Sequence, residues 1–269
     1  MNTRIPRRQI LGMAALVGAS ALDDAWSGTD AAAARTSVAM TQPGLKGRTT
    51  MPKQPLTVGD VTLHVGSTGG SDFIGGETQM SYMPLDPDDT LILFADLQTG
   101  IIELTATNDL ARLRRAVAAL AKLASLFIIP AIVTTAPAEG GPRVTPEIAA
   151  SLGELPTHTR TTTDAFTHAP TRDAIVQTGR KTLLIAGVAT EIIVQHSALS
   201  GAAGGFHVQV VVDACGGLSP RTEDAALRRL TQAGVVITSV ASIAGQLAGD
   251  FTQPQGGKAL GILYEFLSG

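Results

Sequence analysis

The stretch that decides the fold is TLLIAGVATEIIVQ, Thr182–Gln195. Its first six residues form a continuous apolar run, which is typical of a strand buried on both faces of a parallel sheet. From Thr190 onward the sequence predicts a helix that glycines end, so the strand turns directly into a helix. A turn of this kind is a common position for a catalytic residue. Here it offers Ile192 and Ile193, neither of which can act as a nucleophile.

Predicted strands and helices alternate along the rest of the chain. Besides the strand at 182–187, the sequence predicts strands at 91–95, 127–135, 157–163, 207–214 and 235–240. Helical spacing predicts helices at 107–126, 169–179, 190–205 and 219–234, with Thr107 or Asn108 capping the first and Ser219 the last. This alternation favours an α/β fold with three αβα layers around a six-stranded, mainly parallel, Rossmann-like sheet. Such a sheet binds small molecules beyond the carboxyl ends of its strands.

The composition is that of an ordinary soluble domain. The chain has 269 residues, 44% of them hydrophobic and 16% charged, which is enough to bury a core. The net charge is −3 and no long basic run occurs, so a nucleic-acid partner is not expected. The single cysteine, Cys215, excludes an intrachain disulfide, and the five histidines lack metal-ligand spacing. We therefore expect neither a cofactor nor a metal.

Residues 1–34 have the pattern of an export signal. Arg7–Arg8 precede an apolar run, Ile10–Leu22, and small residues follow at Asp30–Ala34. The arginine pair resembles a twin-arginine signal, and an ordinary secretory signal is the alternative. The apolar run is too short for a transmembrane helix. We expect an exported protein, periplasmic or extracellular, without stable membrane insertion after signal removal.

The folded domain is expected to follow a linker or arm at residues 35–55, which has few large apolar residues. The domain then covers residues 56–269, and the alternation around Gly59–Asp60 predicts a small hairpin at its start. Gly66–Gly76 is rich in glycine but lacks the lysine of a phosphate-binding loop, so we expect a flexible loop.

Two segments and the order of the elements resemble the isochorismatase-like hydrolase superfamily. They are LILFADLQTGI, Leu91–Ile101, and AGVATEIIVQHSALSGAAGGFHVQVVVDACG, Ala186–Gly216. The likeness is to the cysteine-hydrolase branch, in which a strand ends in Asp-x-Gln and a later turn has the sequence Gly-Val-x-Thr-Glu. It covers roughly residues 91–240. The resemblance implies an isochorismatase-like fold, a small-molecule substrate and a homo-oligomer.

The resemblance also implies catalytic roles for Asp96 and Arg160. Asp96 matches the general base of the family, and a carboxylate that caps a loop is the alternative. Arg160 takes the place of the family's lysine, before the pair Ala165–Phe166. An arginine keeps its proton, but it can hold a carboxylate or an oxyanion and keep Asp96 ionised. A surface arginine is the alternative interpretation.

The turn after Gly187 is implied to form the rest of the site. The family has a cis peptide here, between Val188 and Ala189, which orients backbone N–H groups as an oxyanion hole. We expect Asp96 and Arg160 to line one pocket with Ile193 at its floor. The pocket is expected to include Gln98, Phe166, Val188, Ala189, Thr190 and Ile193. Thr190 is also expected to cap the following helix.

The nucleophile of the cysteine branch is missing, because its position holds Ile193. Cys215 follows a different strand, and we interpret it as a small buried residue. The nicotinamidase branch fits badly, since its metal site needs histidine and residues 136–156 contain none.

Two hypotheses from different classes remain. In the first, the protein is a hydrolase that acts through Asp96 without a cysteine. The isochorismatase branch also lacks the cysteine, and its aspartate acts as an acid toward a vinyl ether while water completes the hydrolysis. In the second, the chain is a degenerate member, a pseudoenzyme that binds a small molecule or serves as an oligomeric scaffold.

Overall fold

The computed structural model describes residues 56–58, 61–63 and 83–268, which belong to two compact units. One unit contains the strands β1 (Leu56–Val58) and β2 (Val61–Leu63), which pair in antiparallel register. The predicted hairpin is therefore confirmed. The predicted export signal, the linker at 35–55 and the glycine-rich loop lie outside the described residues.

The second unit is built on a six-stranded sheet, ordered β5-β4-β3-β6-β7-β8. Its strands are β3 (Thr90–Ala95), β4 (Ala131–Thr135), β5 (Thr157–Thr159), β6 (Thr182–Gly187), β7 (His207–Val211) and β8 (Val236–Thr238). All neighbouring pairs are parallel, which confirms the α/β fold. The central strands β3 and β6 are buried at every residue, and this explains their continuous apolar sequences.

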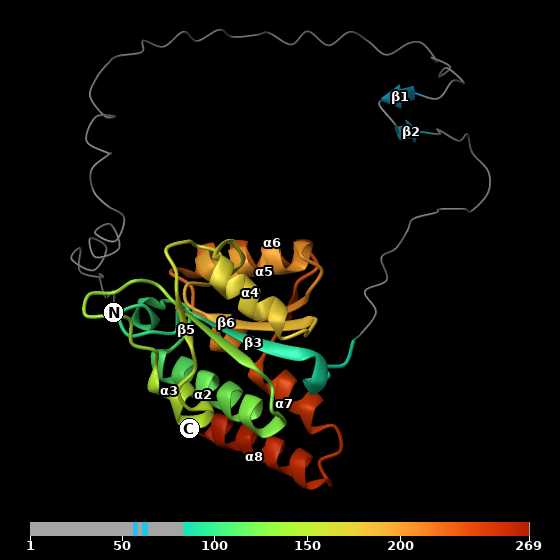
Figure 1. The fold of residues 1–269 in the computed structure, drawn as a ribbon. Helices are drawn as coiled ribbons and strands as arrows, with labels where there is room; N and C mark the ends of the chain where they lie inside the picture. The colour runs from blue at the N-terminus through green and yellow to red at the C-terminus, as the bar shows by residue number, and fades with distance from the viewer. Residues whose placement is uncertain (1–55, 59–60, 64–82, 269) are drawn as a thin grey trace, which may run out of the picture. The chain divides into compact units, whose positions relative to one another are not determined.

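Helices cover both faces of this sheet, so the three-layer arrangement is confirmed (Figure 1). One layer contains α4 (Ala169–Gln177), α5 (Gln195–Ala203) and α6 (Pro220–Gln232), and the other contains α2 (Leu110–Phe127), α3 (Pro146–Leu152), α7 (Val240–Ala248) and α8 (Pro254–Ser268). Alternate side chains of β3 enter separate cores. Leu91 and Leu93 pack on the α4–α6 side, whereas Ile92 and Phe94 pack on the α2 side.

Helix α2 begins later than predicted, because its N-cap is Asp109. The Asp109 carboxylate accepts a hydrogen bond from the backbone N–H of Arg112 at 2.9 Å. The predicted caps bind the loop after β7 instead. Thr107 accepts from the backbone N–H of Gly217 at 2.8 Å, and the amide of Asn108 donates to the carbonyl of Asp213 at 2.9 Å.

Four predicted strands are shorter in the structure. The strand predicted at 157–163 ends at Thr159. Phe127 still belongs to α2, and Ile128 ends that helix with a left-handed φ of 58°. β7 stops at Val211, where a 3₁₀ turn, Val212–Ala214, begins. Val240 starts α7 rather than ending β8.

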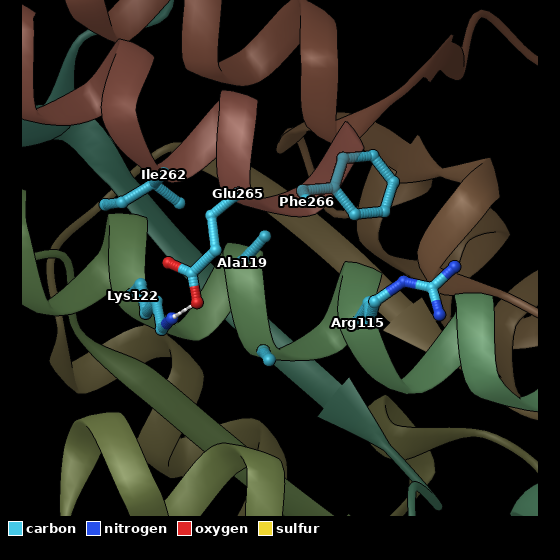
Figure 2. A pocket seen from close by; sticks show the side chains of 7 residues that line it. Arg115, Ala119, Lys122, Ile262, Glu265 and Phe266 are labelled. Atoms are coloured by element: carbon cyan, nitrogen blue, oxygen red, sulfur yellow. Dashed lines mark hydrogen bonds and ion pairs between the residues drawn. The ribbon is translucent and has the colours of Figure 1, made fainter. Parts of the chain in front are cut away.

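A shallow pocket lies between α2 and α8 (Figure 2). Arg115 and Lys122 line it from α2, and Ile262 and Phe266 line it from α8, while Lys122 pairs with Glu265 across it. Its volume of about 70 Å³ is far below that of ordinary ligand sites, so we interpret it as a packing gap between two helices.

Candidate functional site

Asp96 occupies the point where β3 ends at the carboxyl edge of the sheet. Its backbone adopts a left-handed φ of 55°, which is uncommon outside glycine and often marks a functional position. Its N–H donates to the carbonyl of Thr134 on the neighbouring strand at 3.0 Å. The Thr134 hydroxyl donates to Oδ1 of Asp96 at 3.3 Å, and Nη2 of Arg160 donates to Oδ2. Within residues 83–268 no backbone N–H donates to this carboxylate, so the capping interpretation does not describe it.

Arg160 reaches Asp96 from the far side of β4. It directly follows β5, and its N–H donates to the carbonyl of Thr135 at 2.9 Å, which fixes the start of the side chain. Nη1 donates to the carbonyl of Thr162 and Nη2 donates to Asp96. Nε is buried and finds no partner in the described part of the chain. Since Arg160 is buried, the alternative of a surface arginine is wrong.

Burial controls the protonation of Asp96. Desolvation raises the pKa of its carboxyl above the usual 3.8, while the Arg160 guanidinium and the Thr134 hydroxyl lower it by smaller amounts. Arg160 therefore acts in the expected direction, but burial outweighs it. A buried carboxyl with a raised pKa next to a fixed cation is a candidate for proton transfer in a reaction.

The turn after β6 has an unpaired backbone donor at Ala189. The Val188–Ala189 peptide is cis. The N–H of Val188 donates to the carbonyl of Ala95 at 3.2 Å, and that of Thr190 donates to the carbonyl of Gly216 at 3.0 Å. The N–H of Ala189 has no acceptor among the described residues. Of the groups expected to form an oxyanion hole, Ala189 N–H is thus the one left open.

Gly187 allows this turn to lie directly against the end of β3. A Cβ atom at position 187 would stand 2.3 Å from the carbonyl oxygen of Ala95, so no other residue fits without a shift of the backbone. Ala95 precedes Asp96 and Gly187 precedes the open turn. The close contact therefore holds the two halves of the candidate site at one fixed separation.

Thr190 does not cap the helix, contrary to expectation. The chain first forms a π-helical turn, η4 (Thr190–Val194), whose N-cap is Ala189 without a side-chain hydrogen bond. The Thr190 hydroxyl instead donates to Oε1 of Glu223 on α6 at 2.7 Å. A π-helical segment of this kind is frequent at functional sites.

Ile193 is buried in the core on the α4–α6 side of the sheet, in one cluster with Ala95 and Ala165. Because Ala95 is the last residue of β3 and directly precedes Asp96, this cluster lies beneath the end of that strand. Val188 and Ala189 belong instead to the core on the opposite side.

Two of the expected pocket residues have structural partners. The Gln98 side chain donates to the carbonyl of Ala136 at 3.0 Å and accepts from the N–H of Ala136 at 2.8 Å, so it ties two loops together. The Phe166 ring packs on Phe206, with ring centroids 5.6 Å apart.

The cysteine and serine side chains near the turn, Cys215 and Ser197, each have a hydrogen-bond partner. Burial raises the pKa of Cys215 to about 12, and its thiol points to the carbonyl of Ile185 at 3.9 Å. The Ser197 hydroxyl accepts a hydrogen bond from the N–H of Ala165 at 2.9 Å. A protonated, buried thiol and an occupied hydroxyl are poor nucleophiles.

The sequence did not single out Thr134 or Glu223, although each contacts a candidate residue. Thr134 had a usable signal, because it is one of the polar residues that end a predicted strand. No group of three or more metal-ligating side chains occurs in the described regions. Nor does any helix there have the length and hydropathy to cross a membrane.

Comparisons with known proteins agree on one family. The isochorismatase domain matches residues 90–242. The probable hydrolase YcaC of Escherichia coli (strain K12) is 36% identical over 173 residues, which are 63% of this chain and 83% of YcaC. The crystal structure of the YcaC gene product, an octameric hydrolase of unknown specificity, has a TM-score of 0.62 at 31% identity and covers 70% of this chain and 98% of its own.

Two further solved structures share the fold. YcaC from Pseudomonas aeruginosa, solved with hexane-2,5-diol and covalent acrylamide, has a TM-score of 0.65 at 32% identity and covers 70% of this chain and 96% of its own. MAR1 ribonuclease from Caenorhabditis elegans has a TM-score of 0.62 at 21% identity and covers 68% of this chain and 93% of its own. At that identity the second likeness concerns the fold alone.

Proposed function

This chain belongs to the isochorismatase family of the cysteine-hydrolase superfamily, and from that premise we propose that it hydrolyses a small molecule through Asp96 without a cysteine nucleophile. The observation that carries the proposal is the buried Asp96–Arg160 pair at the ligand-binding edge of the sheet. Burial raises the pKa of the Asp96 carboxyl, as an acid catalyst requires.

The chemistry that suits such a carboxyl is the hydrolysis of a vinyl ether. Asp96 gives its proton to the terminal vinyl carbon, whose double-bond electrons form the new C–H bond and leave an oxocarbenium ion. Water adds to the cationic carbon and returns a proton to Asp96. The resulting hemiketal breaks its C–O bond and releases an alcohol and a ketone. No step needs a side-chain nucleophile, so Ile193 is compatible with this reaction.

Two unpaired donors support an oxygen-rich substrate. Nε of Arg160 is buried and has no partner within the described ranges, and the N–H of Ala189 lacks an acceptor there. A buried donor without a partner costs roughly 1–3 kcal/mol, which a substrate oxygen would recover. We assign Arg160 to a substrate carboxylate and Ala189 to a developing oxyanion or a carbonyl oxygen.

The test is a panel of vinyl ethers, amides and esters with wild type, Asp96→Ala and Ile193→Cys. The proposal expects turnover of a vinyl ether by wild type that Asp96→Ala abolishes. Turnover unchanged by Asp96→Ala would remove Asp96 from the site.

One observation favours the second hypothesis, the pseudoenzyme. The branch with the Gly-Val-x-Thr-Glu turn uses a thiol where this chain has buried Ile193. A degenerate member would bind a small molecule without turning it over. Activity in Ile193→Cys, but in no assay of wild type, would decide for this hypothesis.

We also propose a homo-oligomer, because the related YcaC is octameric and α8 exposes Tyr264 and Leu267. Light scattering after size-exclusion chromatography tests this, and a monomeric mass would exclude it.

The proposed export is tested by cell fractionation of wild type and of a chain with Arg7→Lys and Arg8→Lys. Retention of the double variant in the cytoplasm would favour the twin-arginine type over an ordinary secretory signal.

A further inference from the structure

Two Thr–Glu pairs from distant parts of the chain exchange hydrogen bonds. Thr190 and Glu191 begin η4, and Thr222 and Glu223 lie in the first turn of α6. The Thr190 hydroxyl donates to Oε1 of Glu223 at 2.7 Å, and the Thr222 hydroxyl donates to Oε1 of Glu191 at 2.6 Å. Each Thr–Glu pair thus donates one hydrogen bond through its threonine hydroxyl and accepts one through its glutamate carboxylate. We call these four residues the Thr–Glu brace.

The brace joins the open turn to the loop that precedes α6. Oε1 of Glu191 also accepts from the N–H of Leu218 at 2.9 Å. The N–H of Thr190 donates to the carbonyl of Gly216 at 3.0 Å. Side chains and backbone therefore tie the same two segments together, and neither segment can shift without breaking several hydrogen bonds.

The two carboxylates are packed closely around Gly217. A Cβ at this position would lie 2.7 Å from Cβ of Glu223 and 3.1 Å from Oε2 of Glu191. That Oε2 atom is buried and has no partner among residues 83–268. A buried carboxyl oxygen without a hydrogen-bond partner lowers stability rather than adding to it. We therefore interpret the brace as a device that orients the turn, and not as a source of stability for the fold.

We propose that Glu223 and Thr222 are positioning residues, which act through Thr190 and Glu191 respectively to hold the N–H of Ala189 in place. The inference rests on the proposed function, because it assigns that N–H to a substrate oxygen. Thr190 is held at its N–H by Gly216 and at its hydroxyl by Glu223. Ala189 is the residue directly before it, so its N–H is fixed by the same anchors. A misplacement of about 1 Å at a reacting group can cost on the order of 100-fold in rate.

The test compares Glu223→Ala with Glu223→Gln, which keeps an acceptor oxygen, and with Asp224→Asn as a matched control. Asp224 is the next residue of α6, but it is exposed and pairs with Arg228. The substrate is whichever panel compound wild type hydrolyses with dependence on Asp96. We expect Glu223→Ala to lower kcat about tenfold or more with KM nearly unchanged, and Glu223→Gln and Asp224→Asn to stay within about threefold of wild type.

A second readout separates positioning from folding and from the proposed function. Hydrogen exchange at the amides of Thr190 and Leu218 should speed up about tenfold or more in Glu223→Ala, while the amides of β3 and β6 stay protected. A normal kcat in Glu223→Ala, or unchanged exchange at both amides, would overturn the brace. If the proposed function is wrong, wild type will show no turnover that depends on Asp96. The hydrogen-exchange rates at Thr190 and Leu218 then still decide whether α6 fixes the turn.

Discussion

Arg160 and Asp96 form a buried ion pair across the width of β4, with side chains only 3% and 8% exposed. The pair joins the ends of β3 and β5, which are not neighbours in the sheet. Burial nevertheless raises the pKa of the carboxyl. The relationship therefore combines a fixed positive charge with an acid that can still take up a proton.

Asp96→Asn should lower kcat/KM for the substrate by roughly 100-fold or more, because the amide cannot give or accept the proton. The fold should persist, since an amide resembles the protonated carboxyl that burial favours. Steady-state kinetics and thermal unfolding measure the two effects, with the exposed Asp173→Asn as control. Loss of activity together with loss of the folded state would leave the catalytic assignment without support.

The raised pKa also predicts a dependence of stability on pH. The folded protein holds the Asp96 proton more tightly than the unfolded chain, whose carboxyl titrates near 3.8. The stabilisation that the protonated Asp96 gives to the folded protein is therefore fully present below that pH, and it is lost as pH rises through the pKa of the folded state. The free energy of unfolding of wild type, minus that of Asp96→Asn, should fall from about pH 4 towards neutrality. Urea titrations of both proteins measure it, and a difference that rises with pH would contradict the raised pKa.

Thr134→Val should weaken catalysis without removing the acid. The variant loses the hydroxyl that donates to Oδ1 of Asp96, so the carboxyl is oriented by Arg160 alone and its pKa rises further. We expect kcat to fall about tenfold and the alkaline limb of the pH profile, where Asp96 loses its proton, to move to higher pH. Thr135→Val is a close control, because its hydroxyl pairs with Thr159 and not with Asp96. Equal effects of the two substitutions would refute a specific role for Thr134.

Cys215 should not react with thiol reagents while the protein is folded. The side chain is fully buried and its pKa is raised to about 12, so very little thiolate forms at ordinary pH. Labelling by a chromogenic disulfide should follow the rate of unfolding in urea. Rapid labelling of native protein at about pH 8 would show an accessible thiol and reopen its catalytic role.

Ile193 should behave as a core residue in unfolding experiments. Ile193→Val should cost about 0.5–1.5 kcal/mol and Ile193→Ala about 2–5 kcal/mol, because each leaves a cavity of increasing size. Urea unfolding measures both, with the less buried Ile192→Val as a comparison. Costs near zero would mean that the position faces open space instead of the cluster with Ala95 and Ala165.

The sheet was predictable because its central strands are apolar on both faces. The strand at 182–187 was predicted to the residue, and β3 was missed only at Thr90. Helix α6 was also found, since Ser219 caps it and Gly234 follows it with a left-handed φ of 81°. Local signals of this kind need no knowledge of the rest of the fold.

Other elements depended on contacts that a local pattern does not contain. The α2 cap moved to Asp109 because Thr107 and Asn108 bind a loop more than a hundred residues away. Helices α3, α7 and α8 were not predicted, and α7 and α8 pack on α2 and on each other. The site shows the same division. The motif indicated Asp96 and the turn at Val188–Ala189, and Thr134 could have been found from its place at the end of a predicted strand. Glu223 is brought to Thr190 by a tertiary contact that no local pattern contains.

The tight fit of Gly187 against Ala95 limits how the sequence of this turn can evolve. Any side chain at position 187 collides with a carbonyl oxygen, so a single substitution there disturbs the backbone of both strands. Ile193 is held by side-chain packing alone, and a core of that kind accepts residues of similar size. Mutation can therefore exchange the chemistry of the turn while its architecture stays fixed.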